Sequence, residues 1–416
     1  MGRKPALIFI FITLFLAIVG IGIVVPILPA LVEELQGKGL ARASYTYGLL
    51  VALYSLMQFI FAPLLGSLSD RFGRRKVILA SLLGAGLDYF LLAFAPNLWW
   101  FVVGRLIAGI TGANFTAASA YIADISPPEK RAANFGLIGA AFGLGFVVGP
   151  AIGGWLGEIG LRVPFIAAGI LTLLNWLYGV FVLPESLAPE NRRAFSWKRA
   201  NPVGALLDLR RYPMVFGLSG SFFLIHMSHQ VLPSTWVLYT AYRYEWSTGQ
   251  VGMSLALVGL MAALVQGGLT RVVVPKLGEK KTAVFGLAMG CVSLVLYGLA
   301  TEGWMLYPVI VVGSLSGLAN PAIKGLISRS VGADEQGAVQ GTLTSIMSVA
   351  GIVGPPIATG LFGYFISTRA LREVPGAAFF FSALLLVGAI IVAVRSFRRV
   401  VRPREEEEVL DVPGPL

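Results

Sequence analysis

The sequence contains few charged residues, two histidines and one cysteine. Lys, Arg, Asp and Glu together make up 13% of the 416 residues, whereas an ordinary soluble domain has about 25%. This low charge excludes a soluble globular protein. Cys291 alone excludes a disulfide framework and a cysteine metal site, and the histidines provide a single i, i+3 pair.

Motifs for enzymatic chemistry are also missing. The sequence has no glycine-rich phosphate loop followed by lysine and no nucleophile motif in an aqueous domain. We therefore expect no enzyme, no cofactor and no bound metal. If transport is energised, we expect an ion gradient rather than ATP to drive it.

Long apolar runs dominate the chain instead. Hydrophobic residues make up 56% of it and the mean hydropathy is +0.79. Uncharged runs of about 20 residues are long enough to cross the ~30 Å hydrocarbon core of a bilayer. The runs predict an all-α membrane protein with 12 transmembrane helices, over Ala6–Leu31, Tyr47–Leu68, Val77–Ala95, Trp99–Ile122, Phe135–Trp155, Val163–Leu183, Pro213–Tyr239, Gly249–Val274, Thr282–Ala300, Trp304–Ile327, Gly337–Phe365 and Pro375–Val394.

The distribution of the +11 net charge predicts the orientation in the membrane. When alternate loops are assigned to alternate faces, 24 Lys and Arg residues fall on the face with both termini and six on the other. The positive-inside rule then places both termini and the central linker in the cytoplasm. The Glu405–Glu408 run is either a solvated tail or a docking element.

A long polar interruption divides the chain nearly in half and indicates a duplication. Gly48, Ala52, Leu53, Leu56 and Met57 recur 204 positions later, and Gly136, Gly149 and Pro150 recur 205 positions later. We predict two six-helix halves, 1–183 and 213–395, joined by a linker, 184–212, and followed by a tail, 396–416. Paired six-helix halves are typical of secondary transporters with a midplane site.

Three strings carry a family resemblance. The loop after the second run reads GSLSDRFGRRK (66–76), with a turn glycine and breakable Asp–Arg pairs. Together with GRLIAGITGANFTAASAYIAD (104–124) and GLIGAAFGLGFVVGPAIGG (136–154), it resembles the major facilitator superfamily and its proton-driven antiporters. The strings LDYFLLAF (87–94), MQFIFAPLLG (57–66), STWVLYT (234–240) and EQGAVQG (335–341) are similar to bacterial tetracycline efflux antiporters.

The resemblance implies a cytoplasmic gate and a helix-packing motif. We expect Asp70 to contact the helix N-terminus near Glu335–Ala338, where a helix dipole favours an anion, and Arg71 or Arg74 to pair with Asp124. The gate residues are Gly66, Asp70, Arg71, Gly73, Arg74 and Asp124, and the packing residues are Gly139, Gly143, Gly149 and Pro150.

The sequence also departs from the tetracycline antiporters. These carry acids in helices 1 and 9 and a histidine in helix 8, where this chain has Ala17, Cys291 and Ala262; the helix 3 acid is matched by Asp88. A cationic metal chelate would lose its countercharges. We therefore predict that metal-chelated tetracycline is not the best substrate.

Ionisable residues within the runs are the candidates for proton coupling, because charge in a membrane is costly and usually functional. Asp88 is either a proton carrier or a structural partner of a neighbouring helix. Arg105 is a cavity or relay residue, or part of a structural ion pair. His226 and His229 either move protons and bind substrate or form interhelical hydrogen bonds.

Polar and aromatic side chains elsewhere in the runs are candidates for the substrate cavity. Lys324 shares a helix face with Asn320 but is long enough to reach the cytoplasm, which leaves Asn320 as the candidate. Gln58 and Gln266 are cavity donors or packing residues. The predicted cavity set is Gln58, Thr116, His226, Gln230, Trp236, Gln266 and Asn320.

These features predict a proton-coupled exporter of lipophilic drugs or amphiphiles that works by alternating access. The alternatives are a metabolite or lipid symporter or facilitator on the same fold, and a membrane sensor that transports nothing. We expect the partners to be a small-molecule substrate, protons and the lipid bilayer, with no nucleic acid, in a monomer. The resemblance implies the bacterial inner membrane.

Overall fold

The chain folds entirely into helices over the part that the structure describes. This computed structural model describes residues 3–112, 114–127, 130–193, 195, 213–329 and 336–399, and no strand occurs among them. Eleven helical segments in these ranges are long and apolar enough to cross a membrane. The predicted all-α membrane architecture is confirmed.

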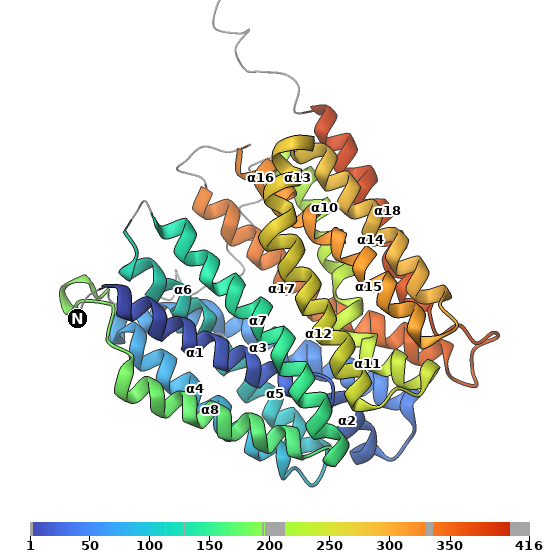
Figure 1. Cartoon of the computed structure of the whole chain (residues 1–416), viewed down its shortest axis with the longest axis horizontal. Coiled ribbons are helices and arrows are strands. Elements are labelled where there is room, and N and C mark those ends of the chain that lie inside the picture. The colour runs from blue at the N-terminus through green and yellow to red at the C-terminus, as the bar shows by residue number, and fades with distance from the viewer. Residues whose placement is uncertain are drawn as a thin grey trace, which may run out of the picture.

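The N-terminal half, blue to green in Figure 1, begins with a broken span. One continuous helix was predicted over Ala6–Leu31, but the helix stops at Val24 and restarts at Leu28. Pro26 explains the break, because its ring lacks an N–H and disfavours helical backbone at the preceding residue. The helices of this half are α1 (Arg3–Val24), α2 (Leu28–Gln36), α3 (Leu40–Phe72), α4 (Arg74–Ala93), α5 (Leu98–Gly112), α6 (Asn114–Ile125), α7 (Arg131–Ile159) and α8 (Val163–Val182).

The C-terminal half, yellow-green to red in Figure 1, contains several interrupted spans. A short 3-10 turn, η2 (Pro189–Asn191), lies between the halves. The elements of this half are α10 (Pro213–His229), α11 (Val231–Tyr244), α12 (Thr248–Leu264), η4 (Val265–Leu269), α13 (Thr270–Leu277), α14 (Glu279–Leu299), η5 (Gly303–Met305), α15 (Leu306–Ser314), η6 (Leu315–Leu318), α16 (Ala319–Arg329), α17 (Gln336–Phe365) and α18 (Ala377–Arg399).

Two of these interruptions have local causes. α10 and α11 together cover the span predicted over Pro213–Tyr239, which brings the eleven spans found in the described ranges to twelve. The two helices separate at Gln230 because Pro233 has no N–H to donate to the carbonyl of His229. In the next span the segment Val265–Leu269 is π-helical and contains Gly267 and Gly268. Such bulges widen a helix locally and are frequent at functional sites.

The two halves lie against each other at one end of the bundle. We name the ends by their turns: the basic end has the turns at Gly73 and Gly278, and the opposite end has those at Gly37 and Gly160. α7 packs along α12 and α3 along α17. At the opposite end, a Cβ on Gly154 would stand 3.0 Å from the Gly252 Cα, so the backbones touch.

The same helix pair separates toward the basic end. A Cβ on Gly139 of α7, or on Gly267 of the η4 segment that follows α12, would meet no atom within 4 Å. Near the middle, Gly143 approaches the Cβ of Ala263 at 3.4 Å. The halves are therefore closed at the opposite end and parted at the basic end, as α7 and α12 show in Figure 1.

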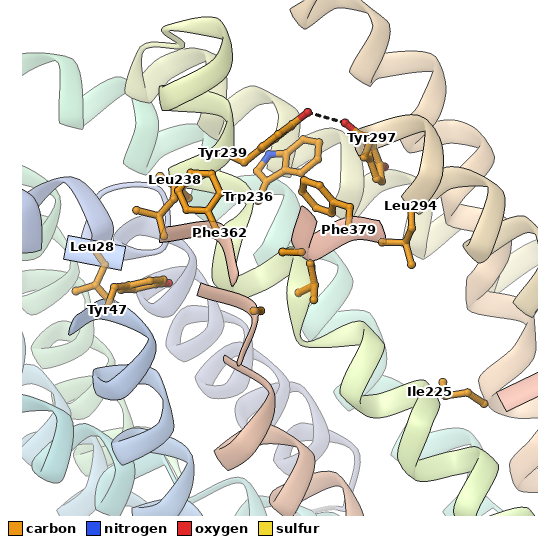
Figure 2. Close-up of a cluster of buried hydrophobic side chains, with 14 of the residues drawn as sticks. Leu28, Tyr47, Ile225, Trp236, Leu238, Tyr239, Leu294, Tyr297, Phe362 and Phe379 are labelled. Carbon is orange, nitrogen blue, oxygen red and sulfur yellow. Dashed lines mark hydrogen bonds between the residues drawn. The ribbon is translucent and has the colours of Figure 1, made fainter. Parts of the chain in front are cut away.

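Buried aromatic rings close the opposite end of the C-terminal half. Figure 2 shows Tyr239, Tyr297 and Phe379 converging from α11, α14 and α18. The Tyr239 hydroxyl donates to the Tyr297 carbonyl at 2.6 Å, and its ring meets Phe379 edge-on with the centroids 4.8 Å apart. Trp236 lies beside them, where this aromatic layer borders a cavity.

Candidate functional site

A cavity of about 270 Å³ lies within the N-terminal half. Helices α1, α3, α4, α5 and α8 surround it, and its wall is mostly apolar. Asp88 and Arg105 are the two charged residues of this wall. Polar lining residues are Tyr47, Tyr54, Tyr89, Thr111 and Thr172.

Asp88 and Arg105 do not bond to each other. Asp88 is 2% exposed, and its Oδ1 has no hydrogen-bond partner among the described residues. The Arg105 Nε is likewise buried without a partner there, although the guanidinium carbon lies 5.9 Å from the centre of the Tyr54 ring. A carboxylate and a guanidinium therefore line the same cavity, and each has a polar atom that makes no hydrogen bond to the described residues.

A second cavity of about 340 Å³ lies within the C-terminal half. Of the predicted residues, His229, Trp236 and Gln266 line it. The Trp236 indole N–H donates to the Ser254 hydroxyl at 2.9 Å, which holds the ring in place. No Asp, Glu, Lys or Arg is among its lining residues, all of which lie in the described part of the chain.

The two cavities are neighbours across the interface between the halves. Val25, in the break between α1 and α2, lines both of them, and so does Pro233 of α11. Val25 lies in the span that is interrupted between α1 and α2, and Pro233 lies in the span that is interrupted between α10 and α11. The proline breaks therefore form the border between the cavities.

The structure places the other predicted cavity residues outside the lining of both cavities. His226 is buried, with its Nδ1 2.9 Å from the Phe222 carbonyl oxygen and its ring 6.1 Å from that of His229. Gln230 packs over Gly354 at the break between α10 and α11. Three further candidates also lie elsewhere: Gln58 donates to the Tyr54 hydroxyl at 2.8 Å, Thr116 lies beside Gly66, and the Asn320 Oδ1 is buried without a partner among the described residues.

The positions at which the sequence departs from the tetracycline antiporters have different surroundings. Ala17 lines the N-terminal cavity and Ala262 lines the C-terminal cavity. Cys291 lines neither, and its Sγ donates to the Ala383 carbonyl of α18 at 3.7 Å. Two of the three departures therefore leave a methyl group on a cavity wall.

A cluster of ion pairs and hydrogen bonds surrounds Arg74 at the basic end, where the sequence predicts a gate. Arg74 is 8% exposed, and its Nε lies 3.1 Å from the Asp124 Oδ2. Its Nη1 donates to the Ser69 hydroxyl at 2.6 Å and lies 2.5 Å from the Asp70 Oδ1. Of the two arginines expected to reach Asp124, Arg74 is the one that does, while Arg71 is exposed beside Phe72.

The turn conformation supports this arrangement. Gly73 has φ +101°, which disfavours any residue with a Cβ, and it lets the chain reverse between α3 and α4. The other half of the predicted gate, the contact of Asp70 with Glu335–Ala338, lies outside the residues whose side chains the structure describes.

The start of the linker also contacts this cluster, which was not predicted from the sequence. The Glu185 Oε1 accepts from the backbone N–H groups of Arg74, at 2.9 Å, and Leu187, at 3.2 Å, and so caps the N-terminus of α4. The Ser186 hydroxyl donates to the Asp124 Oδ2 at 3.0 Å. An acidic residue directly after a span was the available signal, but its partner lies 111 positions away.

The glycines assigned to helix packing divide into two groups. Gly149 packs against Gly22 and Val19 of α1, and Pro150 stands beside Gly22. A Cβ on Gly139 would meet no atom within 4 Å, and one on Gly143 would be in van der Waals contact with the Ala263 Cβ. The close contacts between the halves come instead from Gly154, Gly157 and Gly252, toward the opposite end.

A latch at the opposite end was also not predicted. Ser247 begins α12 with a capping box to Gln250, and its hydroxyl donates to the Glu158 Oε1 of α7 at 3.0 Å. The Thr248 hydroxyl donates to the Gly154 carbonyl at 3.0 Å. These bonds join the two halves where they are already closely packed.

Comparison with known proteins assigns the family. The family model described as Major Facilitator Superfamily matches residues 10–355 and 276–413. The chain belongs to the major facilitator superfamily. It is a multi-pass membrane transporter, and its 12 spans are those of this fold.

Several curated relatives are tetracycline resistance proteins. The class C protein of Escherichia coli is 43% identical over 92% of this chain and 96% of its own length. The class E protein of Escherichia coli is 41% identical over 95% of this chain and 96% of its own length. Both relatives are matched over nearly their whole length, so the resemblance found in the sequence is confirmed.

A solved structure shows the same fold. The crystal structure of the nucleoside transporter NupG superimposes with a TM-score of 0.77 at 12% identity, over 96% of this chain and 100% of that one. At this identity the likeness concerns the arrangement of helices alone.

Proposed function

We propose that this transporter exports lipophilic drugs or related amphiphiles in exchange for protons. The single observation that carries the proposal is the unbonded pair of Asp88 and Arg105 in a buried cavity beside the interface of the halves. An ionisable residue in a membrane is expensive and usually functional. The relatives named for tetracycline resistance support drug export as the direction.

The halves are proposed to move as two bodies, 1–183 and 213–395, joined by the linker 184–212 and followed by the tail 396–416. In the arrangement described here they are joined at the opposite end and parted at the basic end. Rocking about the cavities would close the basic end and open the other, which is alternating access. The basic end is proposed to be cytoplasmic because of its excess of Lys and Arg.

Asp88 is proposed to carry the proton. As an acceptor without a protein partner, its carboxyl group can hold a proton when the cavity is dry and release it when water or substrate solvates the carboxylate. Arg105 stays charged throughout and stabilises the ionised carboxylate across the cavity. His229, which faces the second cavity, is the group proposed to link protonation to substrate.

The Arg74 cluster is proposed to close the basic end. Its ion pairs to Asp70 and Asp124 lie within the N-terminal half, so they are available to exchange for contacts with the other half during closure. Glu185 and Ser186 couple the linker to the same cluster.

The test uses purified protein in proteoliposomes with an imposed pH gradient. A panel of drugs, lipids and metabolites is offered, and accumulation is measured with the gradient intact and after its collapse by nigericin. We expect at least one lipophilic amphiphile to accumulate against its own gradient, and this accumulation to vanish with nigericin and to be unaffected by ATP. Downhill flux that ignores the pH gradient would indicate a facilitator and contradict the proposal.

A further inference from the structure

Three residues that line the N-terminal cavity each carry a buried polar atom without a hydrogen-bond partner among the described residues. These atoms are the Asp88 Oδ1, the Arg105 Nε and the Thr172 Oγ1. Asp88 and Thr172 are each 2% exposed. A buried polar atom without a hydrogen bond is unfavourable. The wall of this cavity therefore carries a carboxylate and a guanidinium whose hydrogen-bonding capacity the protein leaves partly unused.

The charges of the lining add to zero. Among the described residues that line the two cavities, Asp88 is the one acid and Arg105 is the one permanent cation. The charges of Asp88 and Arg105 balance each other, so a ligand with a net charge would bring one charge into the cavity that has no counterpart there. Uncompensated charge in a buried site is strongly unfavourable, so the lining favours a ligand with no net charge.

The neighbouring cavity has a different chemistry. Trp236, Tyr297 and Leu294 present apolar and aromatic surface there, and the wall carries no carboxylate or guanidinium. Trp236 and Tyr297 meet edge-to-face with their centroids 5.2 Å apart, which makes a fixed aromatic corner. Val25 and Pro233 line both cavities, so the two lie next to each other at the interface between the halves.

We propose that the substrates are electroneutral amphiphiles with a head that both donates and accepts hydrogen bonds. The head donates to Asp88 and accepts from Arg105, and its aromatic or apolar body lies against the Trp236–Tyr297 corner. A primary carboxamide on an aromatic body is the simplest such molecule. This assignment rests on the proposed function, since it identifies the substrate of the same cavities.

The first experiment compares three probes with one aromatic body and different heads: naphthylpropionamide, naphthylpropylamine and naphthylpropionate. Binding to the purified transporter in lipid nanodiscs is measured by isothermal titration calorimetry at neutral pH. The carboxamide should bind at least roughly tenfold more tightly than the amine or the acid, the factor expected for hydrogen bonds to charged groups. Equal affinity for the three heads would overturn the proposal.

Two variants move the charge balance in opposite directions. Asp88→Asn leaves a net positive lining, so the naphthylpropionate should gain affinity relative to the amide. Arg105→Gln leaves a net negative lining, so the naphthylpropylamine should gain instead. Glu34→Gln, at an exposed position of α2, is the matched control and should keep the order of the unmodified protein. Head preferences unchanged in both cavity variants would also overturn the proposal.

The readout separates this assignment from the proposed function. Selective binding of the carboxamide without accumulation driven by a pH gradient supports the assignment and contradicts proton-coupled export. Driven accumulation of drugs with no preference among the three heads supports export and contradicts the assignment.

Discussion

The two histidines differ in what each can contact, although they are three positions apart. His229 lines the C-terminal cavity, whereas His226 is 6% exposed and its ring is tilted against that of Phe222 with the centroids 4.1 Å apart. A group that exchanges protons with the transport pathway must reach water in at least one state. The structure therefore favours His229 over His226 as the substrate-linked titratable group.

This difference gives the first prediction. His229→Gln should reduce accumulation driven by a pH gradient by roughly tenfold or more, because positioned proton-transfer groups contribute about 10²–10⁴-fold. His226→Gln, which keeps a side-chain amide near the Phe222 carbonyl, is the matched control and should change it less than about threefold. Proteoliposome uptake at several gradients checks both, and the reverse order of effects would contradict the assignment.

The residues that line the two cavities were predictable from the sequence only in part. Asp88 and Arg105 stand out because charges are rare in apolar runs, and both line one cavity. Helical spacing gives the face of a residue but not the neighbour that covers it. Five of the residues predicted for the substrate cavity line neither of the two cavities described here, and their role there stays a prediction: Gln58, Thr116, His226, Gln230 and Asn320.

At the level of elements, the α7–α12 contact predicts where a methyl group is tolerated. A Cβ on Gly154 would collide with the Thr248 carbonyl and stand 3.0 Å from the Gly252 Cα, whereas one on Gly139 of the same helix meets nothing within 4 Å. Gly154→Ala should destabilise the closed end by about 1–3 kcal/mol, as overpacking does. Thermal unfolding followed by tryptophan fluorescence measures this, with Gly139→Ala as the control that leaves the midpoint unchanged or raised.

The Arg74 cluster is the second element that can be tested. Arg74→Gln removes the ion pairs to Asp70 and Asp124 and should lower the transport rate by roughly tenfold, since each charge-assisted bond contributes about 1.5–3 kcal/mol. Asp70→Asn should act in the same direction. Lys76→Gln, at an exposed position of the same turn, should leave the rate unaffected. Wild-type rates in both cluster variants would show that the cluster is not a gate.

The elements themselves were largely predictable, apart from their interruptions. Apolar runs gave the spans, but the breaks at Pro26 and Gln230 and the π-helical segment at Val265–Leu269 were read as continuous helix. Prolines are tolerated in membrane helices, so their presence alone does not tell a kink from a full break. Glu185 was missed for another reason: its partner, the start of α4, is distant in sequence.

For the whole molecule, the apolar cavities predict weak handling of metal-chelated tetracycline. Ala17 and Ala262 leave Asp88 as the one acid among the described lining residues. Magnesium-dependent tetracycline export should therefore be slower than export of an electroneutral aromatic amphiphile by the same preparation. Paired flux assays decide this, and tetracycline exported faster than every other compound tested would contradict the prediction.

The overall architecture was predictable from the sequence, but which end of the helix bundle is open was not. The apolar runs and the near-constant repeat offset predicted two six-helix halves, and the resemblance of the motif strings to the major facilitator superfamily predicted its fold. Which end is open depends on a small difference between two packings of the same helices, and a hydropathy pattern carries no information about it. The contacts at Gly154 and their absence at Gly139 identify the open end in the structure.

The most direct test of proton-coupled alternating access is to compare driven accumulation with substrate exchange in Asp88→Asn. Exchange needs alternation of the loaded carrier, whereas accumulation also needs a proton to bind and leave. The account predicts that proteoliposomes with Asp88→Asn still exchange substrate at saturating concentration, although the substrate affinity changes, and lose accumulation driven by a pH gradient. Full accumulation in Asp88→Asn would contradict the account, because a carrier without this carboxyl group would still be coupled to protons.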